Sequence, residues 1–317
     1  ITIVALGALL YPALKTAGYG DRFSLGLVTS SGSLGILFAP SLPLILYGVV
    51  AQQLDLPISM SINELFLAGL LPGVLMLLIL SAYSVYHGRV LRSPDHPGFD
   101  RREAWAAIRD AGWELPLPLF VLGGIYGGLI AISEAAALAA VYALIVEVVI
   151  RRDIHWRRLP DVLVDAMKLV GAILLILGVS LASTNIMIDA RVPTRLFEWI
   201  QSVVDNRWTF LILLNTFLLV LGMMLDIFSA LVIIVPILLP VALGYGIDPL
   251  HLGIIFLANM QIGYFTPPVG MNLFIASFRF GKPVMTLYRA TLPFFFLLLA
   301  AVLIITYVPA LSLWLPR

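Results

Sequence analysis

Two long apolar segments of this chain are interrupted in the same way. The first carries Gly35 and, five residues later, Pro40; the second carries Gly263 and, five residues later, Pro268. Because proline lacks a backbone N–H and clashes with the preceding turn, we expect each helix to be broken there. Within a membrane, unwound backbone is tolerated only where it is buried in protein or lines a cavity. Two matched breaks therefore predict a binding site built around them.

The composition indicates what surrounds these breaks. Of the 317 residues, 61% are hydrophobic and 12% are charged, whereas about 25% are charged in a soluble domain. The composition therefore predicts an all-α polytopic membrane protein in contact with membrane lipid. A net charge of +1 without a basic patch gives no indication of a nucleic-acid partner. With no cysteine and four dispersed histidines, we expect no transition-metal site and no cofactor.

Long apolar runs predict the membrane segments, since a crossing helix needs about 20 apolar residues. The expected segments are 1–14, 23–49, 65–86, 116–132, 134–150, 163–187, 208–225, 227–243, 252–277 and 290–314. Both breaks fall within such segments, at 23–49 and 252–277. The chain begins at Ile1, inside an apolar run. We therefore expect 1–14 to be the second arm of a hairpin whose first arm lies upstream.

Lys and Arg are concentrated in some loops and absent from others, which indicates the cytoplasmic side. The basic loops are 15–22, 87–115, 151–162 and 278–289, whereas 50–64 and 244–251 contain no Lys or Arg. If 116–132 and 134–150 each cross the membrane, all four basic loops lie inside. The segment 188–207, which contains three arginines, fits this arrangement least well.

With this orientation, one hairpin enters from each side of the membrane, and this predicts an inverted-topology repeat. Each repeat contains a re-entrant hairpin, a broken helix and a whole helix. We expect a first repeat at 1–87, a cytoplasmic linker at 88–115, scaffold helices of the second repeat at 116–190, a periplasmic interfacial segment at 191–207 and the rest of the second repeat at 208–317.

Small polar residues surround both breaks. Freed carbonyl oxygens suit a hard cation such as sodium, and the N-termini of half-helices suit a carboxylate. The expected substrate contacts are Ser33 and Ser41 in the first half, and Gly270 and Asn272 in the second. An alternative is that Gly and Pro only kink packed helices while hydroxyls satisfy the backbone. The matching of the two breaks favours a site.

Two acidic residues fall at predicted bends within the membrane. Asp226 separates 208–225 from 227–243, and Glu134 opens 134–150. An acid at this depth is a functional candidate, but capping of the following helix accounts for each. Direct contact between Asp226 and a cation stays open as the second interpretation. No charged residue lies clearly beside the breaks, so an acidic substrate would depend on helix ends or amides.

Several strings together resemble the large membrane subunit of tripartite ATP-independent periplasmic (TRAP) transporters, the dicarboxylate-transporter M-type family. They include GILFAPSLPLILYG at 35–48, LAGLLPG at 67–73, LGMMLD at 221–226 and TPPVGMNLF at 266–274. The resemblance covers essentially the whole chain, in order. It departs at 129–134, where LIAISE replaces the family's usual Phe-Thr-Pro-Thr-Glu, so no binding role is carried over to that bend.

The resemblance implies an elevator-type transporter of the ion transporter superfamily in the bacterial inner membrane, not an enzyme. Sodium ions would drive uptake of an organic acid, such as a dicarboxylate or sialic acid, delivered by a periplasmic substrate-binding protein. A small membrane subunit would brace the scaffold. The implied sodium ligands are Gly35, Phe38 and Pro40 at one site, and Gly222, Asp226, Gly263, Thr266 and Pro268 at the other. The tip of the first hairpin, which would complete the first site, would lie upstream of Ile1.

Other functions stay open at this level. A stand-alone sodium- or proton-coupled carboxylate carrier would need no binding protein. An intramembrane aspartyl protease needs two facing carboxylates, for which Asp226 and Glu134 are the candidates. A non-transporting scaffold would leave the paired breaks unexplained. The sequence does not specify the acid, the sodium stoichiometry, the oligomeric state or whether the small subunit is fused.

Overall fold

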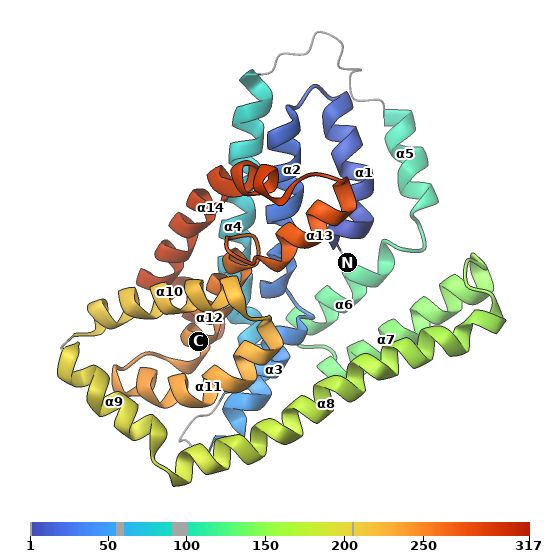
Figure 1. The fold of residues 1–317 in the computed structure, drawn as a ribbon. Coiled ribbons are helices and arrows are strands. Elements are labelled where there is room, and N and C mark those ends of the chain that lie inside the picture. Colours follow the sequence, from blue (N-terminus) through green and yellow to red (C-terminus); the bar gives the residue numbers. More distant parts are fainter. Residues whose placement is uncertain (1, 55–59, 91–100, 205) are drawn as a thin grey trace. The chain divides into compact units, whose positions relative to one another are not determined.

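The computed structural model describes residues 2–54, 60–90, 101–204 and 206–317, and within these ranges it contains helices and no strand (Figure 1). Five helices in these ranges are long and apolar enough to cross a membrane, or six if the two helices flanking the first break count as one span. The predicted all-α polytopic membrane class is confirmed. The chain forms two compact units, Ile1–Pro94 with Val179–Arg317, and Asp95–Gly178, which are described separately.

The first half of the larger unit contains the first broken helix. The helix α1 (Thr2–Thr16) is followed by α2 (Asp21–Ser31), the 3₁₀ turn η1 (Leu34–Leu37), α3 (Leu42–Gln52) and the long α4 (Ile62–Val90). The break lies between α2 and α3, where Gly35 and Pro40 predict it.

The second half of the larger unit repeats this order. After the end of α8, it contains α9 (Val192–Val203), α10 (Arg207–Met224), α11 (Ile227–Gly244), α12 (Pro249–Gly263), α13 (Met271–Phe280), α14 (Val284–Tyr307) and the short α15 (Ala310–Leu313). The helices α10 and α11 form the expected hairpin, and the second break lies between α12 and α13. The helix predicted within 191–207 is present as α9.

The two halves of the larger unit contact each other crosswise. A shift of 228 positions, which is the separation between Ser33 and Gln261, maps α1, α2, α3 and α4 approximately onto α11, α12, α13 and α14. The helix α1 packs against α13 while α11 packs against α3, and α2 packs against α14 while α4 packs against α12. Each contact therefore has a counterpart with the halves exchanged, as a two-fold relation between repeats produces.

Loops that share a predicted side of the membrane also contact each other. The Asp21 carboxylate forms ion pairs with Lys15 (3.0 Å) and Lys282 (3.3 Å), which connects the basic loops 15–22 and 278–289. The hydroxyl of Tyr47 donates to the backbone oxygen of Pro249 (2.7 Å). This second contact brings the middle of α3 to the first residue of α12, which lies within the predicted loop 244–251 that contains no Lys or Arg.

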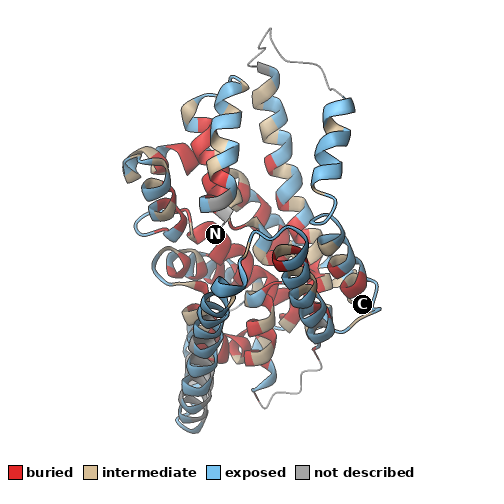
Figure 2. Ribbon diagram, turned by 90° about the vertical axis from the view of Figure 1, so that its right-hand side faces the viewer, coloured by how far each residue is buried: buried red, intermediate tan, exposed pale blue. Residues whose placement is uncertain are grey.

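The centre of the larger unit is α12. Its residues are buried without interruption from Leu250 to Gly263 (red in Figure 2). A helix that is apolar on all sides is stable only when other helices surround it, and α12 contacts α4, α10, α11 and α14. The second break therefore lies at the end of the most enclosed helix of this unit, among elements that hold it in place.

The smaller unit is built from shorter helices. It contains α5 (Arg101–Asp110), α6 (Pro116–Tyr126), α7 (Ile132–Leu144), a π-helical turn η2 (Ile145–Ile150), the 3₁₀ turn η3 (Trp156–Arg158) and the first part of α8 (Leu159–Asp189). The start of α6 lies beside the end of the α7–η2 segment, because Arg151 pairs with Glu114 (2.5 Å) and Tyr142 donates to the backbone oxygen of Trp113 (2.8 Å).

One predicted membrane segment contains a shorter helix than expected. The single helix expected at 116–132 ends at Tyr126, so α6 has 11 residues. At 1.5 Å per residue it is about 16 Å long and does not cross about 30 Å of hydrocarbon alone. The reason is local: Gly127 and Gly128 follow, and Gly128 adopts a left-handed backbone conformation (φ +67°) that ends the helix.

Candidate functional site

The first break is a new helix start and not a simple kink. The axis of α2 and η1 is bent by 41° relative to α3. The Ser41 hydroxyl holds both sides of the bend: it donates to the backbone oxygen of Ile36 (2.5 Å) and accepts from the backbone nitrogen of Leu44 (3.3 Å). Pro43 occupies the first turn of α3, where a missing N–H costs no helical hydrogen bond.

The second break is longer and is held by backbone contacts. The N-cap of α13 is Gly270, whose φ of +51° suits glycine and few other residues. The backbone nitrogen of Asn272 donates to the oxygen of Tyr264 (2.8 Å), which closes the loop. Within it, the Thr266 hydroxyl donates to the backbone oxygen of Ile262 (2.7 Å). The peptide bonds before Pro40 and Pro268 are both cis.

The tip of the α10–α11 hairpin packs on the second break. Gly222 and Gly263 approach so closely that a Cβ added at Gly263 would lie 2.5 Å from the backbone carbon of Gly222. The backbone nitrogen of Gly270 donates to the oxygen of Met223 (3.2 Å). The predicted second group of sodium ligands is therefore gathered from two elements.

Asp226 and Glu134 both act as helix caps. The Asp226 carboxylate accepts from the backbone nitrogens of Phe228 and Ser229, at 3.0 Å each. The Glu134 carboxylate accepts from the backbone nitrogen of Ala131 (2.9 Å). The favoured interpretation of both acids is thus confirmed. Both bonds go to Oδ1 of Asp226. Its Oδ2 keeps lone pairs for a cation, and that contact stays a prediction.

An open cavity of about 490 Å³ lies between the two breaks. Residues from both breaks and from the hairpin tip line it: Ser31, Gly32, Ser33, Gly35, Ile36, Pro40, Ser41, Leu42, Pro43, Phe228, Tyr264 and Asn272. Three of the four predicted substrate contacts, Ser33, Ser41 and Asn272, are among them. Gly270 is not, although it begins the helix that carries Asn272.

The cavity has polar groups but no ionised side chain. No Asp, Glu, Lys, Arg or His is among its lining residues within the described part of the chain. The first turn of α3 and the first turn of α13 both contribute to its wall, through Leu42 and Asn272. Helix N-termini carry partial positive charge, so two of them favour an anion in this space.

The predicted ligands of the first sodium site are less concentrated. Gly35 and Pro40 line the cavity. The side chain of Phe38 packs on α4, where its ring lies 2.7 Å from the position of a Cβ added at Gly73, so the predicted contact of Phe38 is one of its backbone. Gly35 also differs from Gly263, its counterpart in the second half. A Cβ added at Gly35 would meet no atom of the described residues within 4 Å.

One hydrogen bond connects the two breaks directly. The Ser33 hydroxyl donates to the backbone oxygen of Gln261 (3.2 Å), and these two residues are separated by 228 positions, the repeat interval. Because the bond joins counterpart positions, it lies close to the axis that relates the two halves. The breaks therefore meet at the centre of the repeat, next to the cavity.

Sequence reasoning did not single out Tyr264 and Phe228. Both line the cavity, and the hydroxyl of Tyr264 accepts a hydrogen bond from the backbone nitrogen of Ile227 at the hairpin tip (2.7 Å). The position of Tyr264, directly after Gly263 in the broken segment, was the available signal. The composition of the segment does not distinguish it from a packing tyrosine.

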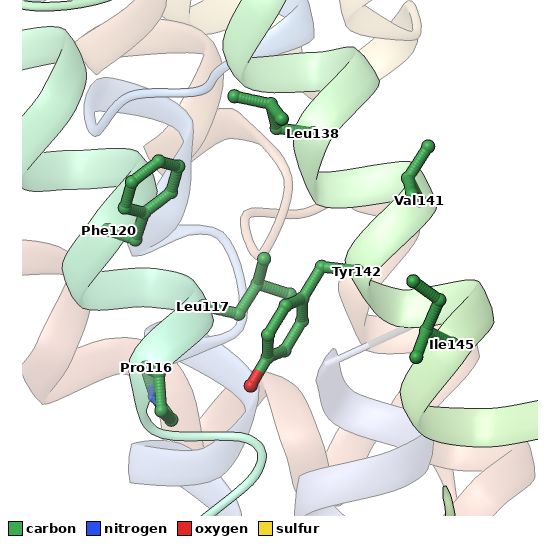
Figure 3. Close-up of a pocket in the computed structure, with 7 residues that line it drawn as sticks. All are labelled: Pro116, Leu117, Phe120, Leu138, Val141, Tyr142 and Ile145. Atoms are coloured by element: carbon green, nitrogen blue, oxygen red, sulfur yellow. The ribbon is translucent and has the colours of Figure 1, made fainter. Parts of the chain in front are cut away.

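A second cavity, in the smaller unit, contains none of the predicted site residues. It measures about 360 Å³ and lies between α6 and α7, lined by Pro116, Leu117, Phe120, Leu138, Val141, Tyr142 and Ile145 (Figure 3). Its polar side chain, Tyr142, already donates to Trp113. This cavity therefore offers apolar contact and little that would recognise a polar solute.

Fold and site define an α-helical membrane protein constructed as secondary transporters are, with interrupted helices beside an open cavity that carries polar groups. The family model described as "Tripartite ATP-independent periplasmic transporter, DctM component" matches residues 2–311. The chain belongs to this family, the large membrane component of TRAP transporters, as its sequence strings predict.

Curated relatives agree. The C4-dicarboxylate TRAP transporter large permease protein DctM of Pseudomonas aeruginosa is 36% identical over 316 residues, covering 100% of this chain and 72% of the relative. The isethionate TRAP transporter permease protein DctMQ of Oleidesulfovibrio alaskensis is 37% identical, over 99% of this chain and 48% of the relative. The sialic acid TRAP transporter large permease protein SiaM of Vibrio cholerae is 32% identical, over 98% and 71%.

Proposed function

We propose that this chain is the transport subunit of a sodium-coupled importer of an organic acid in the bacterial inner membrane. The observation that carries the proposal is the cavity between the two breaks, which receives two helix N-termini and, among the described residues, no acidic side chain. An anion is favoured there without a buried counter-ion, whose desolvation would be costly. Relatives named for C4-dicarboxylates, isethionate and sialic acid support an acid as the cargo.

Sodium is proposed to bind where the hairpin tip meets the second break. Hard cations take oxygen ligands, and helix ends leave backbone carbonyls without helical partners. The hydroxyl proton of Thr266 is used on Ile262, so the lone pairs of its oxygen are available to a cation. Gly222 and Gly263 bring two backbones into direct contact beside it, which concentrates carbonyl dipoles in a small volume.

The proposed system includes a periplasmic substrate-binding protein and a small membrane subunit, as the tripartite family name implies. An elevator movement is proposed for the translocation step. The crosswise packing of the two halves supports it, because repeats with inverted topology exchange roles when access alternates. The domain boundaries given from the sequence stay part of this proposal.

Uptake by the reconstituted transporter tests the proposal. Proteoliposomes containing the large and small membrane subunits are supplied with the binding protein, and uptake of succinate, isethionate and N-acetylneuraminate is measured with and without a sodium gradient. We expect uptake of at least one of these acids, dependent on both sodium and the binding protein. Uptake at full rate without the binding protein would favour the stand-alone carrier instead.

Thr266→Ala tests the sodium site itself. The loss of one oxygen ligand is expected to raise the sodium concentration for half-maximal uptake about tenfold, the equivalent of about 1.4 kcal/mol. Thr266→Ser keeps the oxygen and serves as the matched control. An unchanged sodium curve in a folded Thr266→Ala protein would remove Thr266 from the site.

A further inference from the structure

Two hydrogen-bond donors on the cavity wall have no acceptor among the residues that the structure describes. The side-chain nitrogen of Asn272 is buried, with the residue 8% exposed, and has no partner among the described residues. The Tyr264 hydroxyl oxygen accepts from Ile227, and no acceptor for its proton is found in the same part of the chain. A buried donor without a partner is costly, so a ligand that accepts hydrogen bonds fits between Tyr264 and Asn272.

The two donors differ in their other hydrogen bonds. Asn272 lies in the first turn of α13. Among the described residues, no hydrogen bond joins its side chain to the hairpin. The oxygen of Tyr264, in contrast, is bonded to the first backbone nitrogen of α11, directly after Asp226. Tyr264 is therefore the side chain of the cavity wall that is also hydrogen-bonded to the tip of the hairpin.

We propose that Tyr264 is a positioning residue that couples anion binding in the cavity to the hairpin tip, with its proton donated to the anion and its oxygen holding the Ile227 N–H. This inference rests on the proposed function, since the anion is the transported acid. It assigns to Tyr264 the connection between the cargo and the ion.

The physical basis is the cooperativity of hydrogen bonds. A hydroxyl that donates to an anion becomes a stronger acceptor, so the bound acid strengthens the bond between Tyr264 and Ile227. The hairpin tip, with Asp226 and the Gly222–Gly263 contact, is then held more firmly against the second break. Sodium bound at the Gly222–Gly263 contact likewise holds the hairpin tip against the second break. Linkage requires the coupling to be reciprocal.

The experiment measures the apparent affinity for the acid at low and at saturating sodium. The probe is the member of the panel succinate, isethionate and N-acetylneuraminate that the unmodified transporter takes up. The ratio of the two affinities is the coupling factor, and we expect at least about fivefold for the unmodified protein. In Tyr264→Phe we expect a ratio near one. In Asn272→Ala we expect weaker binding of the acid at both sodium concentrations, with the ratio retained.

Two further variants separate coupling from a general loss of stability. Tyr47→Phe removes another buried tyrosine hydroxyl, which donates to Pro249 and does not line the cavity, and should leave the ratio unchanged. Ile227→Pro removes the N–H from the hairpin side. Proline is accepted at the first position of a helix, and the extended backbone of Asp226 (φ −72°, ψ 155°) permits it. In Ile227→Pro we also expect a coupling factor near one.

The outcomes are distinguishable. If sodium has no effect on acid affinity in the unmodified protein, the proposed function and this inference both fail. If the unmodified protein shows coupling and Tyr264→Phe and Ile227→Pro retain it in full, the inference alone fails. If Tyr264→Phe does not fold, a retained ratio in Ile227→Pro is sufficient to overturn the inference, and a lost ratio supports it.

Discussion

At the scale of single residues, close approach of backbones is the main requirement of the site. Gly222 and Gly263 resemble a packing pair between two membrane helices, where glycine permits main chains to touch. The two glycines are not equally restricted. A Cβ added at Gly222 would have its nearest contact at 3.2 Å, whereas a Cβ added at Gly263 would lie 2.5 Å from the backbone of Gly222. Gly263 therefore tolerates substitution less well than Gly222.

Gly263→Ala is expected to separate the hairpin tip from the second break. The new methyl group would collide with the backbone of Gly222, which cannot rotate away, and such overpacking costs about 1–3 kcal/mol. We expect a lower unfolding temperature of the purified transporter and a weaker sodium dependence of uptake. Gly171→Ala is the control, because a Cβ there meets nothing within 4 Å. Equal unfolding temperatures for the two variants would contradict the prediction.

At the scale of secondary structure, a buried polar group joins α12 to neighbouring helices by hydrogen bonds. The side-chain oxygen of Asn215 on α10 accepts from Asn259 on α12 (2.8 Å) and from Thr306 on α14 (3.1 Å). Each of these residues is buried. Three helices are thus joined through one oxygen, within a membrane interior where an unsatisfied donor finds no water.

Asn215→Leu tests how much these hydrogen bonds stabilise the protein. Leucine preserves volume but leaves the Thr306 hydroxyl and one Asn259 proton without their acceptor, so we expect the free energy of unfolding to fall by about 2 kcal/mol. Denaturation of the detergent-solubilised protein measures it. The neighbouring variant Thr216→Val loses only an exposed bond to Ile212 of its own helix and should change stability by less than about 0.5 kcal/mol. Similar losses in both variants would count against the role of Asn215.

Helices and their breaks were readable from the sequence, because long apolar runs and Gly–Pro clusters have direct backbone consequences. The caps at Asp226 and Glu134 were readable for the same reason, since capping depends on neighbours in the chain. The short α6 was not, because a Gly-Gly pair inside an apolar run does not reveal whether the helix continues. Tyr264 was not, because its role depends on Ile227, 37 positions away, and such a contact exists only after folding.

At the scale of the whole molecule, the crosswise contacts make the membrane orientation testable. The basic loops 15–22 and 278–289 lie together, and α3 contacts the start of α12, beside the loop that contains no Lys or Arg. The former are predicted inside and the latter outside. One measurement of accessibility for the segments predicted inside, and one for those predicted outside, are therefore sufficient to check the inverted arrangement of the larger unit.

The absence of native cysteine permits this measurement with single introduced thiols. Thr16→Cys and Gln53→Cys place one thiol at exposed positions at the ends of α1 and α3. We expect a membrane-impermeant maleimide to label Gln53→Cys from the periplasmic side of intact spheroplasts and to label Thr16→Cys only after the membrane is opened. Labelling of both from the same side would contradict the predicted topology.

The lining of the cavity has a consequence for how the protein responds to acidity. Since none of its described lining residues is an Asp, Glu, Lys, Arg or His, the wall neither gains nor loses protons near neutrality. The peptide dipoles that favour an anion there cannot be titrated at all. If the cavity is the proposed anion site, binding is expected to follow the ionisation of the solute itself, for strong and weak acids alike wherever their charged form predominates.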